Sequence, residues 1–263
     1  MKYKAIFWTI SLAARIAWAQ ADVPLPPDDA SQKKIVADVV ARALQYSKEL
    51  PEFACEVVTR RNVDPTGSRQ HWKIVETVHE ELTFAGNKED YKTLSSNGKK
   101  GGDSRPTAAV SSTDFTNLVA WLFDPKNQTE MTWANWDSVR GHRVHAIGVK
   151  LKADRSPFTI GKGKNQMRAG LMGLVYADSD TGSILRIAVA ATDIPAKYPT
   201  QSVALDLQYD FAKIGDHYFL LPFKAETQSK EGKVLTWNEV DFRDYRKPGA
   251  PAAAAPKDRQ AER

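Results

Sequence analysis

The chain has 263 residues, of which 42% are hydrophobic and 26% are charged, a composition typical of a folded, soluble domain. Its single cysteine excludes a disulfide framework and the cysteine-rich zinc modules. The formal charge of +5 comes from the two ends of the chain, so residues 20–246 are neutral. A neutral body argues against a nucleic-acid-binding protein, which needs a basic surface.

Residues 1–19 have the three parts of a secretory signal peptide. Lys2 and Lys4 give a basic start, an apolar run follows, and Ala17-Trp18-Ala19 forms a small-x-small cleavage site. Arg15 interrupts the apolar run, which leaves an uncleaved or amphipathic N-terminal helix as the alternative. No later stretch reaches the ~20 apolar residues of a transmembrane helix. We therefore predict a periplasmic or secreted protein that has no transmembrane span after signal cleavage.

Two helices are expected. Residues 20–29 are predicted to be an extended, Pro-rich leader, after which Ser31 starts a long helix that ends at Leu50-Pro51. Its apolar residues recur at the three-and-four spacing of one helical face; they are Ile35, Val36, Val39, Val40, Ala43 and Leu44. A second, shorter helix is expected to run from a cap at Ser111–Asp114 to Asp124-Pro125. Its apolar face consists of Phe115, Leu118, Val119 and Leu122.

The rest of the chain is predicted to consist of strands joined by turns. Residues with high β propensity and period-two alternation mark them at 53–62, 72–84, 91–94, 128–136, 139–152, 170–178, 183–192, 203–213, 217–229 and 234–245. The clearest alternation places Leu205, Leu207, Tyr209 and Phe211 on one packed face. Asp178–Gly182 begins like a calcium loop, but its place between two strands favours a hairpin turn.

About ten strands, two helices and no strand–helix alternation predict an α+β fold that is mainly antiparallel β. Because strand twist accumulates, a sheet of this length curls. We therefore expect a strongly curved half-barrel sheet covered by one long N-terminal helix and a second shorter helix. Residues 30–246 would form this single domain, and residues 247–263 a disordered tail rich in Pro and Ala.

Residues capable of catalysis do not gather in the sequence. His142 and His145 are three apart on a strand, so they point to opposite faces and cannot share a metal. Nucleophile-elbow, Walker and paired-histidine motifs are absent, and Cys55 is expected to be buried as a small hydrophobe. Glu76 and Glu80 share a strand face and keep a hydrolase open as an alternative. We predict no catalytic residue, no metal, no cofactor, and hence not an enzyme.

Six short segments carry a resemblance to known proteins: Ala43–Arg61, Leu122–Pro125, Val139–Val144, Leu185–Ile187, Tyr209–Phe211 and Phe242–Tyr245. As a set they resemble a group of uncharacterised secreted proteins of acidobacterial type. In architecture, the chain is similar to the outer-membrane lipoprotein carrier superfamily. That resemblance implies a half-barrel whose helices close an apolar concavity, an acyl chain as ligand, and no catalytic residues.

The predicted function is that of an exported, non-catalytic binding protein that carries or senses a lipid or lipoprotein acyl chain in a concave apolar cavity. The alternative is an envelope protein–protein interaction or scaffold module without a small ligand. Large apolar side chains on strands are the candidate ligand-binding residues, with core packing as the competing explanation. They are Trp72, Ile74, Trp133, Ile147, Leu207, Tyr209 and Trp237.

Overall fold

A computed structural model describes residues 24–100, 118–161, 164 and 166–251 of the chain. The predicted signal peptide, the start of the leader, most of the predicted tail and the helix cap at Ser111–Asp114 lie outside the described residues. Within the described part, no helix is long and apolar enough to cross a membrane.

Helix α1 (Asp29–Glu49) begins two residues earlier than the expected start at Ser31. The N-cap is Asp28, whose carboxylate accepts a hydrogen bond from the Ser31 N–H at 2.7 Å. This bond satisfies one of the N–H groups that the first helical turn leaves free. The leader therefore ends at Asp28. The predicted apolar stripe is confirmed, because Val39 and Ala43 are buried in the core.

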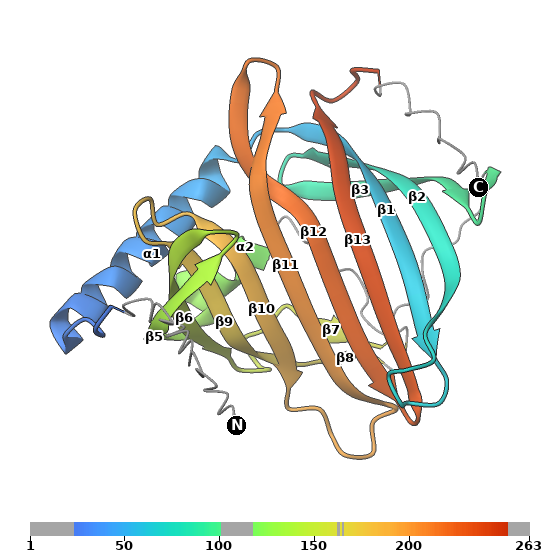
Figure 1. The fold of residues 1–263 in the computed structure, drawn as a ribbon, viewed down its shortest axis with the longest axis horizontal. Helices are drawn as coiled ribbons and strands as arrows, with labels where there is room; N and C mark the ends of the chain where they lie inside the picture. Colours follow the sequence, from blue (N-terminus) through green and yellow to red (C-terminus); the bar gives the residue numbers. More distant parts are fainter. Residues whose placement is uncertain (1–23, 101–117, 162–163, 165, 252–263) are drawn as a thin grey trace, which may run out of the picture.

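All described strands except β7 (Thr159–Ile160) and β8 (Met167–Arg168) form one eleven-stranded antiparallel sheet, in agreement with the predicted fold class. In spatial order they are β4 (Lys99–Lys100), β3 (Lys88–Ser96), β2 (Lys73–Ala85), β1 (Phe53–Asp64), β13 (Val234–Arg246), β12 (His217–Glu231), β11 (Thr200–Ile214), β10 (Ile184–Thr192), β9 (Gly170–Asp178), β6 (His142–Leu151) and β5 (Glu130–Val139). The sheet is open, with β4 and β5 at its edges. Figure 1 shows the long strands crossing the molecule side by side. Helices α1 and α2 lie at the end of the sheet that is formed by β10, β9, β6 and β5.

Three short elements complete the described part of the chain. Helix α2 (Leu118–Phe123) matches the second predicted helix and is followed by the 3₁₀ turn η1 (Pro125–Asn127). In the chain segment that connects β6 to β9, the two short strands β7 and β8 pair with each other. The sequence analysis missed this pair because two residues are too few to show an alternation.

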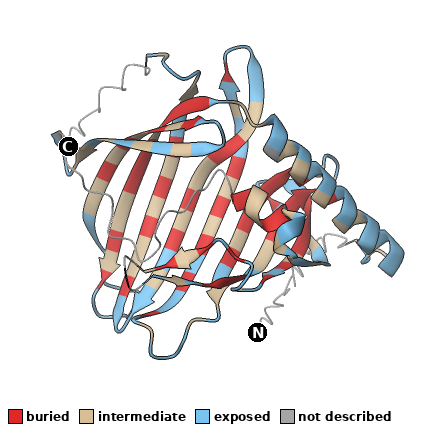
Figure 2. Ribbon diagram, turned by 180° about the vertical axis from the view of Figure 1, so that it is seen from behind, coloured by how far each residue is buried: buried red, intermediate tan, exposed pale blue. Residues whose placement is uncertain are grey.

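The main hydrophobic core lies on one face of the sheet, here called the inner face, and includes residues of α1 and α2. Figure 2 shows buried and more exposed positions alternating along the long strands, as a sheet with one packed face requires. A smaller cluster lies on the outer face of β6, β9 and β10, around Val144, Ala146 and Tyr176.

The predicted alternation in β11 holds as far as Tyr209 and then fails. Leu205, Leu207 and Tyr209 are buried, but Phe211 is 60% exposed. Beyond Tyr209 the β11 residues that pack against the main core are Ala212 and Ile214, so the inward-facing positions have shifted by one. The pairing of β11 with β12 also shifts register between Gln208 and Tyr209.

Strand β11 pairs with β10 only over residues 204–208, and β12 pairs with β13 only from Lys224 onward. Residues 209–222 thus pair only within their own hairpin, beyond the neighbouring ladders.

Candidate functional site

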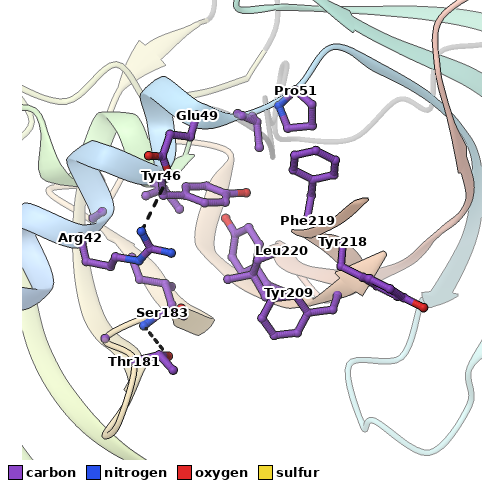
Figure 3. A pocket seen from close by; sticks show the side chains of 16 residues that line it. Arg42, Tyr46, Glu49, Pro51, Thr181, Ser183, Tyr209, Tyr218, Phe219 and Leu220 are labelled. Carbon is purple, nitrogen blue, oxygen red and sulfur yellow. Dashed lines mark hydrogen bonds and ion pairs between the residues drawn. The ribbon is translucent and has the colours of Figure 1, made fainter. Parts of the chain in front are cut away.

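A pocket of about 500 Å³ lies beside the part of the β11–β12 hairpin that extends past its neighbours. It is bounded by the C-terminal half of α1, the turn between β9 and β10, and the start of β12 (Figure 3). Its volume falls within the ~300–1,000 Å³ of ligand pockets. Apolar side chains dominate the lining; they include Ala43, Leu50, Val119, Ile184, Phe219 and Leu220.

The β9–β10 turn is held in place by one buried carboxylate. Asp178 Oδ1 accepts hydrogen bonds from the N–H of Asp180 at 3.1 Å and from the N–H and hydroxyl of Thr181, both at 2.9 Å. Burial alone would raise the pKa of Asp178, but these hydrogen bonds and one from His142 outweigh it and lower the pKa. The predicted hairpin turn at Asp178–Gly182 is confirmed, and it presents Thr181 to the pocket.

Two tyrosines meet across the pocket. Tyr46 reaches from α1 toward Tyr209 on β11, with ring centroids 6.3 Å apart in an edge-to-face arrangement (Figure 3). Both hydroxyl oxygens are buried and have no hydrogen-bond partner. Tyr209 is only 1% exposed. Burial raises the pKa of both phenols, so at neutral pH each carries an O–H donor without a charge.

Next to this pair, the buried groups are satisfied or inert. The Tyr245 hydroxyl, which does not line the pocket, donates a hydrogen bond to the Pro222 carbonyl oxygen. Burial of Cys55 raises the pKa of its thiol to about 12, so the thiol stays protonated. The expectation that Cys55 is a buried small hydrophobe is confirmed.

Charge is confined to the edge of the pocket. Arg42 and Glu49, both on α1, form an ion pair with 3.8 Å between Nη1 and Oε2. Both side chains are about half exposed, so solvent weakens the pair. On the opposite side, Phe211 and Tyr218 are 60% and 67% exposed. The pocket therefore has an aromatic entrance, a compensated ion pair at its edge, and an uncharged interior.

Four of the predicted ligand-binding residues lie on the inner face, but only Tyr209 lines this pocket. Ile147 and Leu207 are fully buried within the core. Trp133 is partly buried against the core and donates its indole N–H to His145 Nδ1 at 3.2 Å. For these three residues, core packing is what the structure shows.

The other three predicted residues, Trp72, Ile74 and Trp237, lie on the outer face and do not line this pocket. Trp237 alternates with the inner-facing Val240 and Phe242, and its ring packs edge-to-face on Trp72 at 5.9 Å. Ile74 is 63% exposed. The pairing of β1 with β2 is irregular between Arg61 and Asn62, so Ile74 does not follow the inward alternation of the later β2 residues.

The sequence analysis missed Tyr46, although a signal was present. Tyr46 follows Val39 by seven residues and Ala43 by three, which is the spacing of one helical face. A tyrosine in an apolar stripe marks a polar atom brought toward the core.

Other groups of potential chemical interest do not converge on the pocket. Within the described residues, no three His, Cys, Asp or Glu side chains lie close enough to hold a metal ion. Of the two acids that kept a hydrolase open, Glu76 lies 3.5 Å from Arg61, and Glu80 accepts a hydrogen bond from the Thr93 hydroxyl.

Comparison with known proteins gives similarity of architecture at low sequence identity. No protein-family model matches the chain, and no curated protein matches it. One similar solved structure is a DUF1329 family protein from Desulfovibrio piger, with 12% identity and a TM-score of 0.39 over 83% of this chain and 94% of that one. A LolA superfamily protein from Nitrosomonas europaea has 10% identity and a TM-score of 0.37 over 82% and 94%. A domain named for outer-membrane lipoprotein sorting, from Vibrio parahaemolyticus, has 8% identity and a TM-score of 0.37 over 84% and 94%.

Proposed function

We propose that the protein is an exported, non-catalytic binding protein that holds a lipid or lipoprotein acyl chain between α1 and the β11–β12 hairpin. The supporting observation is the pocket of about 500 Å³ with its mainly apolar lining. Apolar surface that faces an open pocket is unfavourable in water, and an acyl chain would remove that surface from solvent. The uncharged interior favours the same kind of ligand.

The second candidate is an envelope protein–protein interaction or scaffold module. The observation that favours it is the exposure of Phe211 and Tyr218 on a hairpin that extends past its neighbouring strands. Aromatic side chains are enriched at the centres of protein interfaces. The two candidates differ in what they require of the pocket, because only the first needs it to be filled by a small molecule.

The test begins with the full chain expressed in the periplasm of a bacterial host, followed by native mass spectrometry and lipid extraction. Leu220→Trp adds volume inside the pocket, whereas Leu94→Trp makes the same change at an exposed leucine that does not line it. We expect wild type and Leu94→Trp to carry about one acyl species per chain, and Leu220→Trp to lose it while keeping the circular dichroism of wild type.

A ligand-free mass for wild type, with no lipid in the extract, would overturn the binding proposal. Co-purification of one envelope protein that Phe211→Asp and Tyr218→Asp abolish would then support the interaction module. Equal lipid loading in all three proteins would show that the lipid sits elsewhere and would also contradict the proposed pocket.

A further inference from the structure

The pocket contains a polar feature that an acyl chain by itself does not satisfy. In the described part of the chain, four buried side-chain oxygen atoms have no hydrogen-bond partner. Two of them are the hydroxyls of Tyr46 and Tyr209, and both residues line the pocket. Other tyrosines of the fold are satisfied: Tyr245 donates to Pro222 O, and Tyr198 donates to Ile160 O at 3.0 Å.

A buried hydroxyl without a partner costs free energy, so native structures rarely keep one without a reason. Two such groups on opposite walls of one pocket indicate that something in the pocket completes them. Tyr46 belongs to α1 and Tyr209 to β11, and their rings are in edge-to-face contact. Because both residues line the same pocket, an acceptor that entered between the two rings would meet both donors.

The charges around the pocket limit what that acceptor is. Among the described residues that line the pocket, the one arginine is Arg42, which is about half exposed and paired with Glu49. A carboxylate beside the tyrosines would lose its water shell without gaining a cation, which is costly. A carbonyl oxygen of an ester or amide is uncharged and has two lone pairs, enough for two O–H donors.

On the premise that the pocket binds an acyl chain, we infer that it selects an esterified or amidated chain, whose carbonyl oxygen accepts hydrogen bonds from Tyr46 and Tyr209. A free fatty acid would bind less well because its carboxylate is charged. A plain hydrocarbon would bind less well because it leaves both hydroxyls unpaired. The two tyrosines thus select for the linkage at the head of the chain, while the apolar walls accommodate the chain itself.

The experiment measures displacement of the fluorescent probe N-phenyl-naphthylamine from the delipidated protein by methyl laurate, laurate and dodecane at neutral pH. We expect methyl laurate to bind most tightly. Tyr46→Phe and Tyr209→Phe should each weaken methyl laurate by about 2- to 10-fold, the value of one hydrogen bond. Dodecane should bind both variants as it binds wild type, because it makes no hydrogen bond to either hydroxyl.

Tyr245→Phe is the matched control, since it removes a phenolic oxygen outside the pocket lining and should leave the order of the three ligands unchanged. If the probe binds and all three ligands displace it, but the Tyr46 and Tyr209 variants keep wild-type affinities, the pocket stands and the inference is wrong. Tighter binding of laurate, lost in Arg42→Ala, would also overturn it. If neither the probe nor any ligand binds, the proposed function fails as well.

Discussion

Removing the phenolic oxygen should change the stability of the ligand-free protein in opposite directions at two buried tyrosines. The Tyr209 hydroxyl is buried without a partner, so Tyr209→Phe removes a desolvation penalty of about 1–3 kcal/mol. Some of that gain is offset because the lost oxygen leaves a small gap in the packing. We expect the free energy of unfolding to rise by about 1 kcal/mol.

Tyr245→Phe makes the same chemical change with the opposite consequence. Its hydroxyl donates to the carbonyl oxygen of Pro222. Without that donor, the hydrogen bond is lost and a carbonyl near the core is left unpaired, so we expect the free energy of unfolding to fall by about 1–2 kcal/mol. The two variants share the loss of one atom, and only the hydrogen bonding of that atom differs.

Urea unfolding, followed by tryptophan fluorescence on protein shown to be ligand-free by native mass spectrometry, would measure both effects. If unfolding is followed by heating instead of urea, a change of 1 kcal/mol corresponds to a shift of about 2–4 °C in Tm for a domain of this size. At the same free concentration, methyl laurate should stabilise wild type more than Tyr209→Phe, because the stabilisation by a ligand grows with the logarithm of its concentration divided by its Kd. Equal destabilisation by Tyr209→Phe and Tyr245→Phe would show that the Tyr209 hydroxyl has a partner in solution and would refute the reasoning.

Three further predictions concern residues outside the tyrosine pair. Because burial raises the pKa of Cys55 to about 12, a thiol reagent at neutral pH should label it only after unfolding; rapid labelling of the native protein would contradict its burial. Burial lowers the pKa of His145 below 6.5, so the unfolded chain takes up that proton first. Stability should therefore fall as the pH drops below about 6.5, and His145→Gln should reduce this pH dependence of the urea midpoint. In Gly173→Ala the new Cβ would lie 2.1 Å from the Ala188 carbonyl oxygen, which should cost about 3 kcal/mol or more. Gly148→Ala is the control, with its closest approach 3.1 Å from a threonine side chain; similar losses in both variants would show that close backbone contact is not the cause.

The strands were predictable because their signal is local. In β9 the predicted bounds, residues 170–178, are those of the structure, and a β-branched or aromatic run between turn residues is enough to find such a strand. The start of α1 was predicted at Ser31 instead of Asp29 because Asp28 and Ser31 are both residues that favour an N-cap position. Only the backbone conformation decides which side chain accepts the hydrogen bond.

The faces of the strands were less predictable than their positions. Trp237 and Leu207 are both large apolar residues on strands, and nothing local distinguishes the outward one from the inward one. The distinction depends on which face receives α1. For Ile74 it depends also on the irregular pairing between β1 and β2 at Arg61 and Asn62. A single extra residue in one strand reverses the direction of every side chain beyond it.

The position of the pocket follows from unequal strand lengths rather than from the curvature that the sequence analysis relied on. Curvature alone predicts a cavity along the inner face, where Ile147 and Leu207 are instead buried in the core. Strands β11 and β12 continue past the ends of their ladders with β10 and β13, and the pocket lies between this extension and the C-terminal half of α1. The predicted limits of these strands, 203–213 and 217–229, were close to those of the structure. What the sequence lacked was the extent of pairing with the neighbours, and that extent places Tyr209 where the packed core meets the pocket, with its ring against Tyr46.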